Sequence, residues 1–421
     1  MSKFLKNSVI YAGGDIVNKA VPFLMLPILT RYLTPEDYGL MASFLSLVAF
    51  LSIFIGLSVH GAVNVNFFKL SSEKLRVYIV NAILLLCIST SVVFAIVLLF
   101  DTPISERLLL DKEWIYIAVV VSLSQFITTL NLTLWIAEEK PKPYAIYQLL
   151  QTVLITLLSL VLIVGYEFDW RGQVLAFIIG TVSFAMLSLL MMKQRNYFKL
   201  EYNREDMKDL LSFGLPLVPH QLGGWLSTNA DKLLLITMVG ATSTGLFTVG
   251  YQIGMMMGIV VTALNKAWSP YLYKKLSSNP TISEKIKIVK FTYLYFIAII
   301  VLVIILDFIS TLIFKYMLDE SFASSQEFVI YILVAYGFSG MYFMVGNYIL
   351  YEKKTKLLAS ITLSVAIIQV VLSYLFINMN GAIGVAYSSA ISFAMTFILV
   401  FIFSHRVYPM PWRFWKVEDK I

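Results

Sequence analysis

The sequence predicts an all-α integral membrane protein with about twelve transmembrane helices and no soluble domain. Of its 421 residues, 59% are apolar and only 14% are charged, with a mean hydropathy of +0.81. A soluble domain of this length needs far more charge to cover its surface. Apolar runs of about 20 residues, the length that spans a bilayer as a helix, recur along the whole chain. Lysine and arginine concentrate in alternate loops, which supports an even number of spans.

The apolar runs predict twelve helices in chain order. They cover residues 10–31, 38–60, 77–100, 114–137, 145–166, 172–192, 213–238, 246–272, 288–314, 327–350, 357–378 and 385–405. Their length and the tight turns between them are typical of helices rather than of the short alternating strands of outer-membrane barrels. The longest predicted loops, 193–212 and 274–287, are too short for a folded catalytic domain.

The loop charges predict the orientation. With twelve spans both termini share a side, and the segments on that side hold 24 of the 32 Lys and Arg residues, whereas the opposite loops hold five. The positive-inside rule therefore places both termini in the cytoplasm, with the chain crossing the membrane many times. This distribution accounts for the net charge of +7 and gives no reason to expect nucleic acid as a partner.

The loop at 193–212 divides the chain into two predicted lobes of six helices, residues 1–200 and 201–421. The first helix of each lobe is rich in residues that interrupt helices: Gly13, Gly14, Pro22 and Pro27 in one, and Pro216, Pro219, Gly223 and Gly224 in the other. Interrupted helices at corresponding positions of two halves are typical of the central site of a transporter. We therefore expect both helices to be bent there.

Six ionisable side chains lie within the predicted spans: Asp15, Lys19, Asp231, Lys232, Lys266 and Asp307. Each costs about 2.5–3.5 kcal/mol to insert into lipid, so we expect a wet interior around them. Asp307 is the exception, because it lies near the outer end of its helix, where we expect solvation at the interface. Asp15 and Lys19 are four residues apart on one helical face. They form either a cavity wall that offers a cation to an anionic substrate or a self-neutralising pair. Three acids against three bases do not establish a cationic cavity by counting.

The remaining candidates are weighed one by one. Asp231 and Lys232 are adjacent and point about 100° apart around the helix, so one can line a cavity while the other pairs elsewhere or snorkels. Lys266 lies where it meets either an incoming diphosphate or the lipid headgroups. Polar side chains that suit sugar hydroxyls, or that hold helices together, are Asn64, His220, Asn229 and Gln252. The repeat Gly250, Gly254 and Gly258 predicts a helix-packing face.

Several motifs of chemistry do not occur in the sequence. It has no Walker A sequence and no HExxH, and its single cysteine rules out an intrachain disulfide. With three histidines in all, metal catalysis is not expected either. We therefore expect no cofactor, no metal and no enzymatic activity, and the class that remains is a secondary transporter or passive translocator.

An ordered set of short motifs resembles a known family. The set comprises Phe4-Leu5-Lys6-Asn7-Ser8, Leu29-Thr30-Arg31-Tyr32-Leu33-Thr34-Pro35-Glu36-Asp37-Tyr38-Gly39-Leu40, Phe213-Gly214-Leu215-Pro216-Leu217-Val218-Pro219, Asp231-Lys232, Gly245 and Trp268-Ser269-Pro270. Together with the helix count, it resembles the polysaccharide flippases, which translocate O-antigen and capsule repeat units. That family belongs to the multidrug/oligosaccharidyl-lipid/polysaccharide exporter superfamily.

The resemblance implies two six-helix lobes around a central cavity that opens alternately to the two sides. It implies an undecaprenyl-diphosphate-linked oligosaccharide as substrate, with membrane lipids and polysaccharide polymerase machinery as partners. It also implies the bacterial cytoplasmic (inner) membrane as the location. Cavity charges of the family map onto Asp15, Lys19, Asp231, Lys232 and Lys266. Relatives often carry an arginine near Asn64–Asn66, which this chain lacks. Coupling to protons or sodium through Asp15 or Asp231, or a passive mechanism, stays open.

Two other functions compete with this one. A cation-coupled multidrug exporter of the same superfamily would take cationic drugs, so acids should outnumber bases in its cavity, and here they do not. A membrane polysaccharide polymerase or ligase needs a sizeable catalytic outer loop, and the predicted outer loops at 101–113 and 315–326 are short.

Overall fold

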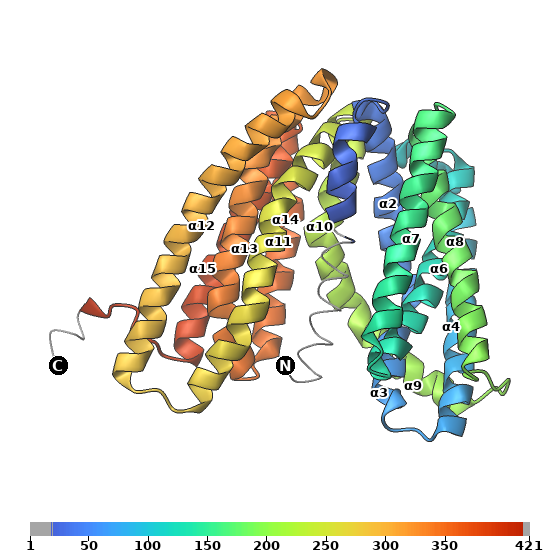
Figure 1. The fold of residues 1–421 in the computed structure, drawn as a ribbon, viewed down its shortest axis with the longest axis horizontal. Helices are drawn as coiled ribbons and strands as arrows, with labels where there is room; N and C mark the ends of the chain where they lie inside the picture. Colours follow the sequence, from blue (N-terminus) through green and yellow to red (C-terminus); the bar gives the residue numbers. More distant parts are fainter. Residues whose placement is uncertain (1–17, 19, 416–421) are drawn as a thin grey trace. The chain divides into compact units, whose positions relative to one another are not determined.

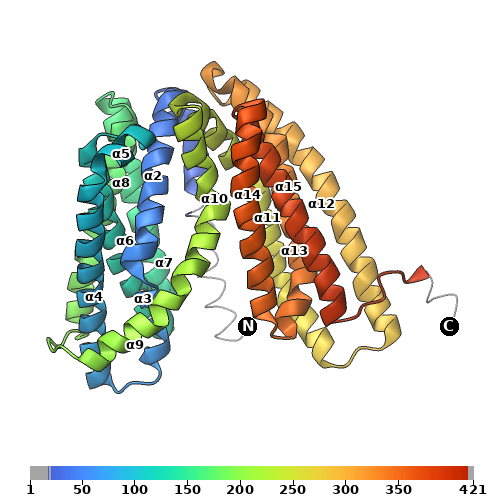
Figure 2. The same cartoon turned by 180° about the vertical axis from the view of Figure 1, so that it is seen from behind.

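The computed structural model describes residue 18 and residues 20–415, and these residues form helices joined by short turns (Figures 1 and 2). Within this part of the chain there is no β-strand. The chain forms two compact units, Met1–Gly245 and Leu246–Ile421. The predicted all-α class is confirmed.

The first unit is built around α2, which packs on α4, α6, α8 and α10. After a short apolar helix, Ala20–Leu29, its elements are α2 (Pro35–Gly56), α3 (Val59–Phe67), α4 (Ser72–Leu99), α5 (Asp101–Leu108), α6 (Lys112–Ala137), α7 (Pro141–Leu160) with the π-helical η1 (Val161–Gly165), α8 (Trp170–Gln194), α9 (Arg204–Gly214), the 3₁₀ turn η2 (Leu215–Leu217) and α10 (Val218–Met238).

The second unit centres on α13, which packs on α12, α14 and α15. Its elements are α11 (Ala241–Ser277), which starts in the first unit, α12 (Ile282–Tyr316), the 3₁₀ segment η3 (Glu320–Ser325), α13 (Gln326–Tyr351), α14 (Thr355–Asn380) and α15 (Ile383–Val407). A Cβ added at Gly254 would lie 2.6 Å from Ile332, and one at Gly258 would lie 2.7 Å from Tyr336. The glycine repeat of α11 therefore packs on α13, as predicted.

Ten of the described helices are long and apolar enough to cross a membrane. They match ten of the twelve predicted spans. Of the first predicted span, 10–31, the structure describes the helical stretch Ala20–Leu29, and Asp15 and Lys19 lie outside the described residues. The seventh span corresponds to α10, which has the length but is too polar to count among the ten.

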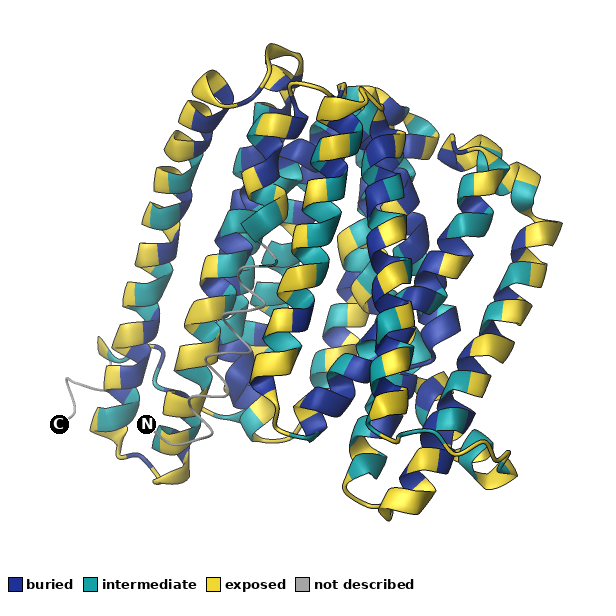
Figure 3. Ribbon diagram, turned by 45° about the vertical axis from the view of Figure 1, so that its right-hand side comes forward, coloured by how far each residue is buried: buried dark blue, intermediate teal, exposed yellow. Residues whose placement is uncertain are grey.

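Exposed residues, yellow in Figure 3, occur along the lengths of the spanning helices, and many of them are large and apolar. On α12, for example, Leu294, Ile297 and Ile304 are 62%, 59% and 63% exposed. Water would penalise such a surface, whereas lipid tails do not. The chain is therefore a multi-pass membrane protein.

Two predicted loops are largely helical, and this corrects the sequence prediction. The segment 193–212 contains most of α9, which Asn203 caps through hydrogen bonds from the backbone N–H groups of Glu205 (2.8 Å) and Asp206 (3.3 Å). The segment 274–287 shrinks to a turn of four residues, since α11 ends at Ser277 and α12 begins at Ile282. A search for apolar runs did not detect these helical turns because they contain charged residues.

The unit boundary lies near residue 245, whereas the predicted lobe boundary lies at 200. The difference arises because α9 and α10 pack on α2, α3 and α4. Backbones also touch closely here: a Cβ on Gly39 would overlap the carbonyl oxygen of Ala241, and one on Gly245 would overlap that of Pro35. The start of α11 is thereby fastened to the start of α2. The division into two lobes of six helices stays a prediction.

Candidate functional site

α10 is the described helix that combines spanning length with a polar composition. Its 21 residues extend over about 31 Å at 1.5 Å per residue, enough to cross the hydrocarbon core. It nevertheless carries His220, Asn229, Asp231 and Lys232, four of the predicted site residues. Such a helix is stable in a membrane when its polar side chains face protein, water or ligand instead of lipid.

The start of α10 is bent, as its prolines predict. α9 leads through the 3₁₀ turn Leu215–Leu217 into α10, and Figure 2 shows α9 running obliquely before α10 rises from it. Pro216 and Pro219 both lie in this stretch, and each lacks the N–H group that would bond one turn back. The predicted interruption of the seventh helix is therefore present.

An aspartate holds α9 against the neighbouring helices. Asp209 Oδ2 accepts hydrogen bonds from Asn66 Nδ2 of α3 at 3.0 Å and from the Tyr78 hydroxyl of α4 at 2.7 Å. The bond from Asn66 is exposed and the bond from Tyr78 is part-buried, so each contributes on the order of 0.5–1 kcal/mol to stability. The cluster orients the segment that enters α10. Sequence reasoning missed the cluster because Asp209 lies more than 100 residues from both Asn66 and Tyr78.

The second predicted helix is interrupted, and this interruption packs against the segment that leads into α10. Leu57 and Ser58, between α2 and α3, have left-handed backbones with φ of 43° and 49°, a conformation that costs non-glycine residues energy. A Cβ added at Gly214 would overlap the carbonyl oxygen of Leu57. Gln221 Nε2 donates a hydrogen bond to Ser58 Oγ. The two irregular stretches therefore hold each other.

Further along, α10 is fixed to α2 by a tryptophan. The Trp225 indole N–H donates to the carbonyl oxygen of Ser46 at 3.3 Å, and its ring lies 5.0 Å from that of Phe50. Contacts of this kind combine apolar burial with one directional bond. They set the rotation of α10 against α2 and hence the directions of its other side chains.

The predicted site residues of α10 differ in exposure. His220 is exposed, Asn229 and Lys232 are half-buried, and Asp231 is buried with 5% exposed. Asn229 Nδ2 donates to Thr228 Oγ1 at 2.9 Å. Asp231 lies eleven residues after His220, or about 17 Å along the helix axis. The group near Asp231 is therefore distinct from His220.

The other predicted site residues lie on two further helices. Asn64 is half-buried on α3 in the first unit, two residues from Asn66. Gln252 is half-buried and Lys266 is exposed on α11 in the second unit. Their assignment to the substrate site stays a prediction.

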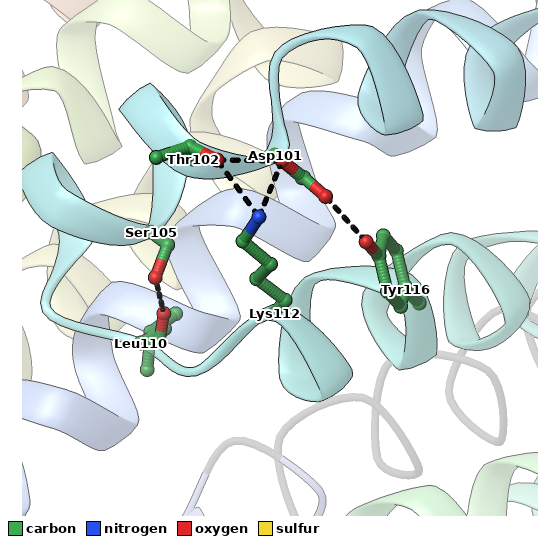
Figure 4. Close-up of polar contacts among 6 residues, drawn as sticks. All are labelled: Asp101, Thr102, Ser105, Leu110, Lys112 and Tyr116. Carbon is green, nitrogen blue, oxygen red and sulfur yellow. Dashed lines mark hydrogen bonds and ion pairs between the residues drawn. The ribbon is translucent and has the colours of Figure 1, made fainter.

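A polar cluster at the predicted outer end of the first unit was also missed. Figure 4 shows Asp101 accepting hydrogen bonds from the Tyr116 hydroxyl at 2.5 Å and from Lys112 Nζ at 2.9 Å, while Lys112 also donates to Thr102 Oγ1 at 2.7 Å. The bonds from Tyr116 and Lys112 hold the pKa of Asp101 well below its usual range. The cluster ties α5 to α6, and α5 in turn packs on α10.

Metal ligands do not gather in the described part of the chain. Across residue 18 and residues 20–415, no group of three or more His, Cys, Asp or Glu side chains is arranged to hold a metal ion. The polar residues of α10 instead offer hydrogen bonds and one cationic group.

Comparison with known proteins reveals similarity to proteins of polysaccharide biosynthesis. Residues 4–275 match the family described as "Polysaccharide biosynthesis protein". A protein of the Lsg locus of Haemophilus influenzae is 24% identical over 372 residues, which cover 87% of this chain and 90% of that protein. The capsular polysaccharide biosynthesis protein CapF of Staphylococcus aureus is 23% identical over 417 residues, covering 94% and 98% of the two chains.

Solved structures share the fold at lower sequence identity. The lipid II flippase MurJ in an inward closed conformation has a TM-score of 0.75 and 13% identity, covering 94% of this chain and 87% of its own. An inward-facing multidrug resistance transporter of the MATE family, in the MOP superfamily, has a TM-score of 0.72 and 14% identity, covering 91% and 94%. The chain shares its fold with these two membrane proteins. The family match over residues 4–275 confirms the resemblance to polysaccharide proteins seen in the sequence.

Proposed function

This chain belongs to the polysaccharide biosynthesis protein family, and from that premise we propose that it flips undecaprenyl-diphosphate-linked oligosaccharide units across the bacterial cytoplasmic membrane. The transporter fold supports movement of a substrate rather than its chemical conversion. The capsular relative supports a glycan as the cargo. MurJ, which shares the fold, is a lipid II flippase, and this supports flipping as the activity.

The polar character of α10 carries the proposal. One charged side chain at the centre of a bilayer costs about 2.5–3.5 kcal/mol, and α10 holds Asp231 and Lys232 in succession. A helix that only filled space would be as apolar as the ten others. A water-filled passage explains the retention of these groups.

In the proposed mechanism the diphosphate-sugar head enters the passage while the lipid tail stays in the bilayer. Lys19, Lys232 and Lys266 offset the phosphate charge, and Asn64, Asn229, Gln252 and His220 bond to sugar hydroxyls. The expected bend of the first helix and the interruption at the start of α10 let the lobes rock, so that the head is exposed on the opposite side. Asp15 and Asp231 are the groups that would couple this movement to protons or sodium.

Deletion and complementation test the proposed function. In a strain that lacks this gene, surface polysaccharide should fall and the lipid-linked unit should accumulate on the cytoplasmic side of the membrane. The wild-type chain should restore both. Unchanged surface glycan in the deletion strain would contradict the proposal.

A multidrug exporter is the second candidate, because a MATE transporter shares the fold. Measuring cationic drug resistance in the same deletion strain separates the two. The flippase proposal expects unchanged drug resistance. Lower resistance together with normal surface glycan would establish the exporter instead.

A further inference from the structure

A pocket in the second unit lies outside the residues assigned to transport. It has a volume of about 550 Å³ and is bounded by α11, α12 and α13. From α11 it is lined by Leu264, Trp268, Tyr271 and Lys275. These follow each other at intervals of four, three and four residues and so share one helical face. Lys266 does not line the pocket.

One wall of the pocket is aromatic. The rings of Trp268 and Phe291 are stacked, 4.9 Å apart with an interplanar angle of 17°, and Tyr271 lies 5.4 Å from Trp268. Tyr271 and Phe291 are 51% and 48% exposed. Aromatic residues with a polar edge are favoured at membrane interfaces, where one end of the ring meets lipid tails and the other meets headgroups.

The rim of the pocket is charged. Lys275, Lys287 and Glu284 line it, which leaves a net charge of +1 for the three. Lys275 Nζ lies 3.8 Å from Glu284 Oε1, while Lys287 is exposed. The positive-inside prediction places this end of α11 and α12 at the cytoplasmic surface. A cation in that position is suited to a phosphate group.

A buried donor in the pocket wall has no acceptor. Trp268 Nε1 is buried, and no hydrogen-bond partner lies within reach among the residues that the structure describes. Leaving such a group unsatisfied costs about 1–3 kcal/mol. A rotation of the indole ring toward the pocket would let an oxygen-rich ligand supply the missing acceptor.

An apolar track leads away from the pocket along α12. Phe291 lines the pocket, and Leu294, Ile297 and Val301 follow on the same exposed side of the helix, 62%, 59% and 48% exposed. A ligand with a long hydrocarbon chain can therefore keep its chain against α12 in the bilayer. A soluble anion would gain nothing from this surface.

We propose that this pocket binds the phosphate group of a membrane lipid. Lys287 and Lys275 contact the phosphate, the Trp268 N–H donates to one of the lipid oxygens, and the lipid chain extends past Phe291 along α12. The phosphate comes either from an anionic phospholipid or from an undecaprenyl carrier. The proposal concerns binding alone and does not depend on the transport function.

Binding to the purified full chain in detergent tests the proposal. Native mass spectrometry would compare phosphatidylglycerol, undecaprenyl phosphate, phosphatidylcholine and inorganic phosphate as probes. We expect the first two to bind and phosphatidylcholine and inorganic phosphate to bind at least about tenfold more weakly. Tighter undecaprenyl phosphate would identify the carrier as the occupant, and equal affinity would identify a general phospholipid site.

Variants locate the bound lipid. Lys287→Ala should weaken binding about tenfold, and Trp268→Phe, which keeps a ring but removes the N–H donor, should weaken it about fivefold. Lys285→Ala is the matched control, since Lys285 lies over the ring of Tyr408 at 5.1 Å and does not line the pocket. Equal binding by Lys287→Ala and wild type, or equal binding of phosphatidylcholine and phosphatidylglycerol, would overturn the proposal. Unfolding curves of each variant confirm that it is folded.

Discussion

α10 and α12 are both long enough to cross a membrane, and they differ in nearly every other respect. α10 is 21 residues long and carries histidine, asparagine, aspartate and lysine. α12 is 35 residues long and apolar through its middle, with much of its surface exposed. The segment that leads into α10 is held by residues far away in the sequence, such as Asn66 and Leu57, whereas α12 starts with its own capping box, Thr281 and Glu284.

The difference shows that two helices of one membrane chain can be stabilised in different ways. α12 needs only apolar side chains against lipid, so local rules suffice for it. α10 keeps polar groups at membrane depth, so other helices must orient it and cover it. We therefore expect substitutions in and around α10 to affect both folding and transport, and substitutions in α12 to affect neither strongly outside its cytoplasmic end.

The largest expected effect is at the start of α10. In Gly214→Ala the added methyl group would overlap the carbonyl oxygen of Leu57, which belongs to the backbone and cannot rotate away. Overpacking of this kind costs about 3 kcal/mol. Unfolding by SDS in mixed micelles measures the loss. Gly224→Ala is the control, because nothing lies within 4 Å of a Cβ there, and equal stability of the two variants would contradict the close approach.

The second prediction compares one aspartate on each helix. Asp231→Asn in α10 should reduce surface glycan in the complementation assay about tenfold, the equivalent of one lost charge-assisted contact. Asp307→Asn in α12 should leave it within about twofold, because Asp307 is expected near the outer interface. Equal activity of the two variants would contradict the assignment of Asp231 to the proposed passage. Protein levels in the membrane serve as the control for folding.

The third prediction concerns the anchor of α9. Asp209→Ala leaves the donors of Asn66 and Tyr78 without their acceptor, so the free energy of unfolding should fall by about 1 kcal/mol. Tyr78→Phe removes one of the two bonds and should cost less. Should Asp209→Ala unfold like the wild type, α10 would not need this anchor, and its contrast with α12 would weaken.

The smallest expected effect is a pH dependence at α5, which packs on α10. Hydrogen bonds from Tyr116 and Lys112 lower the pKa of Asp101 in the folded chain. A lowered pKa in the folded state stabilises the protein above the unfolded value of about 3.9, and this contribution is lost as the pH falls below it. Unfolding measured between about pH 6 and pH 3 should show the loss, and Asp101→Asn should reduce it. An identical pH profile for the variant would exclude Asp101 as the source of the pH dependence.

Much of the fold could be read from apolar runs and loop charges. The ten apolar helices match predicted spans within a few residues at most ends, because insertion into lipid depends on the summed hydropathy of a local segment. Glycine spacing likewise predicted the packing face of α11. The predictions that failed were the loops at 193–212 and 274–287 and the single helix at 38–60. Charged residues leave no apolar run in the two loops, and the left-handed break at Leu57 and Ser58 lies within an apolar run that does not reveal it.

Composition and residue spacing were enough to identify this chain as a multi-pass membrane protein, because each spanning helix satisfies its own backbone hydrogen bonds and its apolar surface indicates lipid as its surroundings. Only the tertiary structure decided three contacts between different parts of the chain. These are the hydrogen bond from Asn66 to Asp209, the close packing of Gly214 on Leu57 and the stacking of Trp268 on Phe291. Contacts between helices depend on rotation and register, which a linear pattern of apolar residues does not encode.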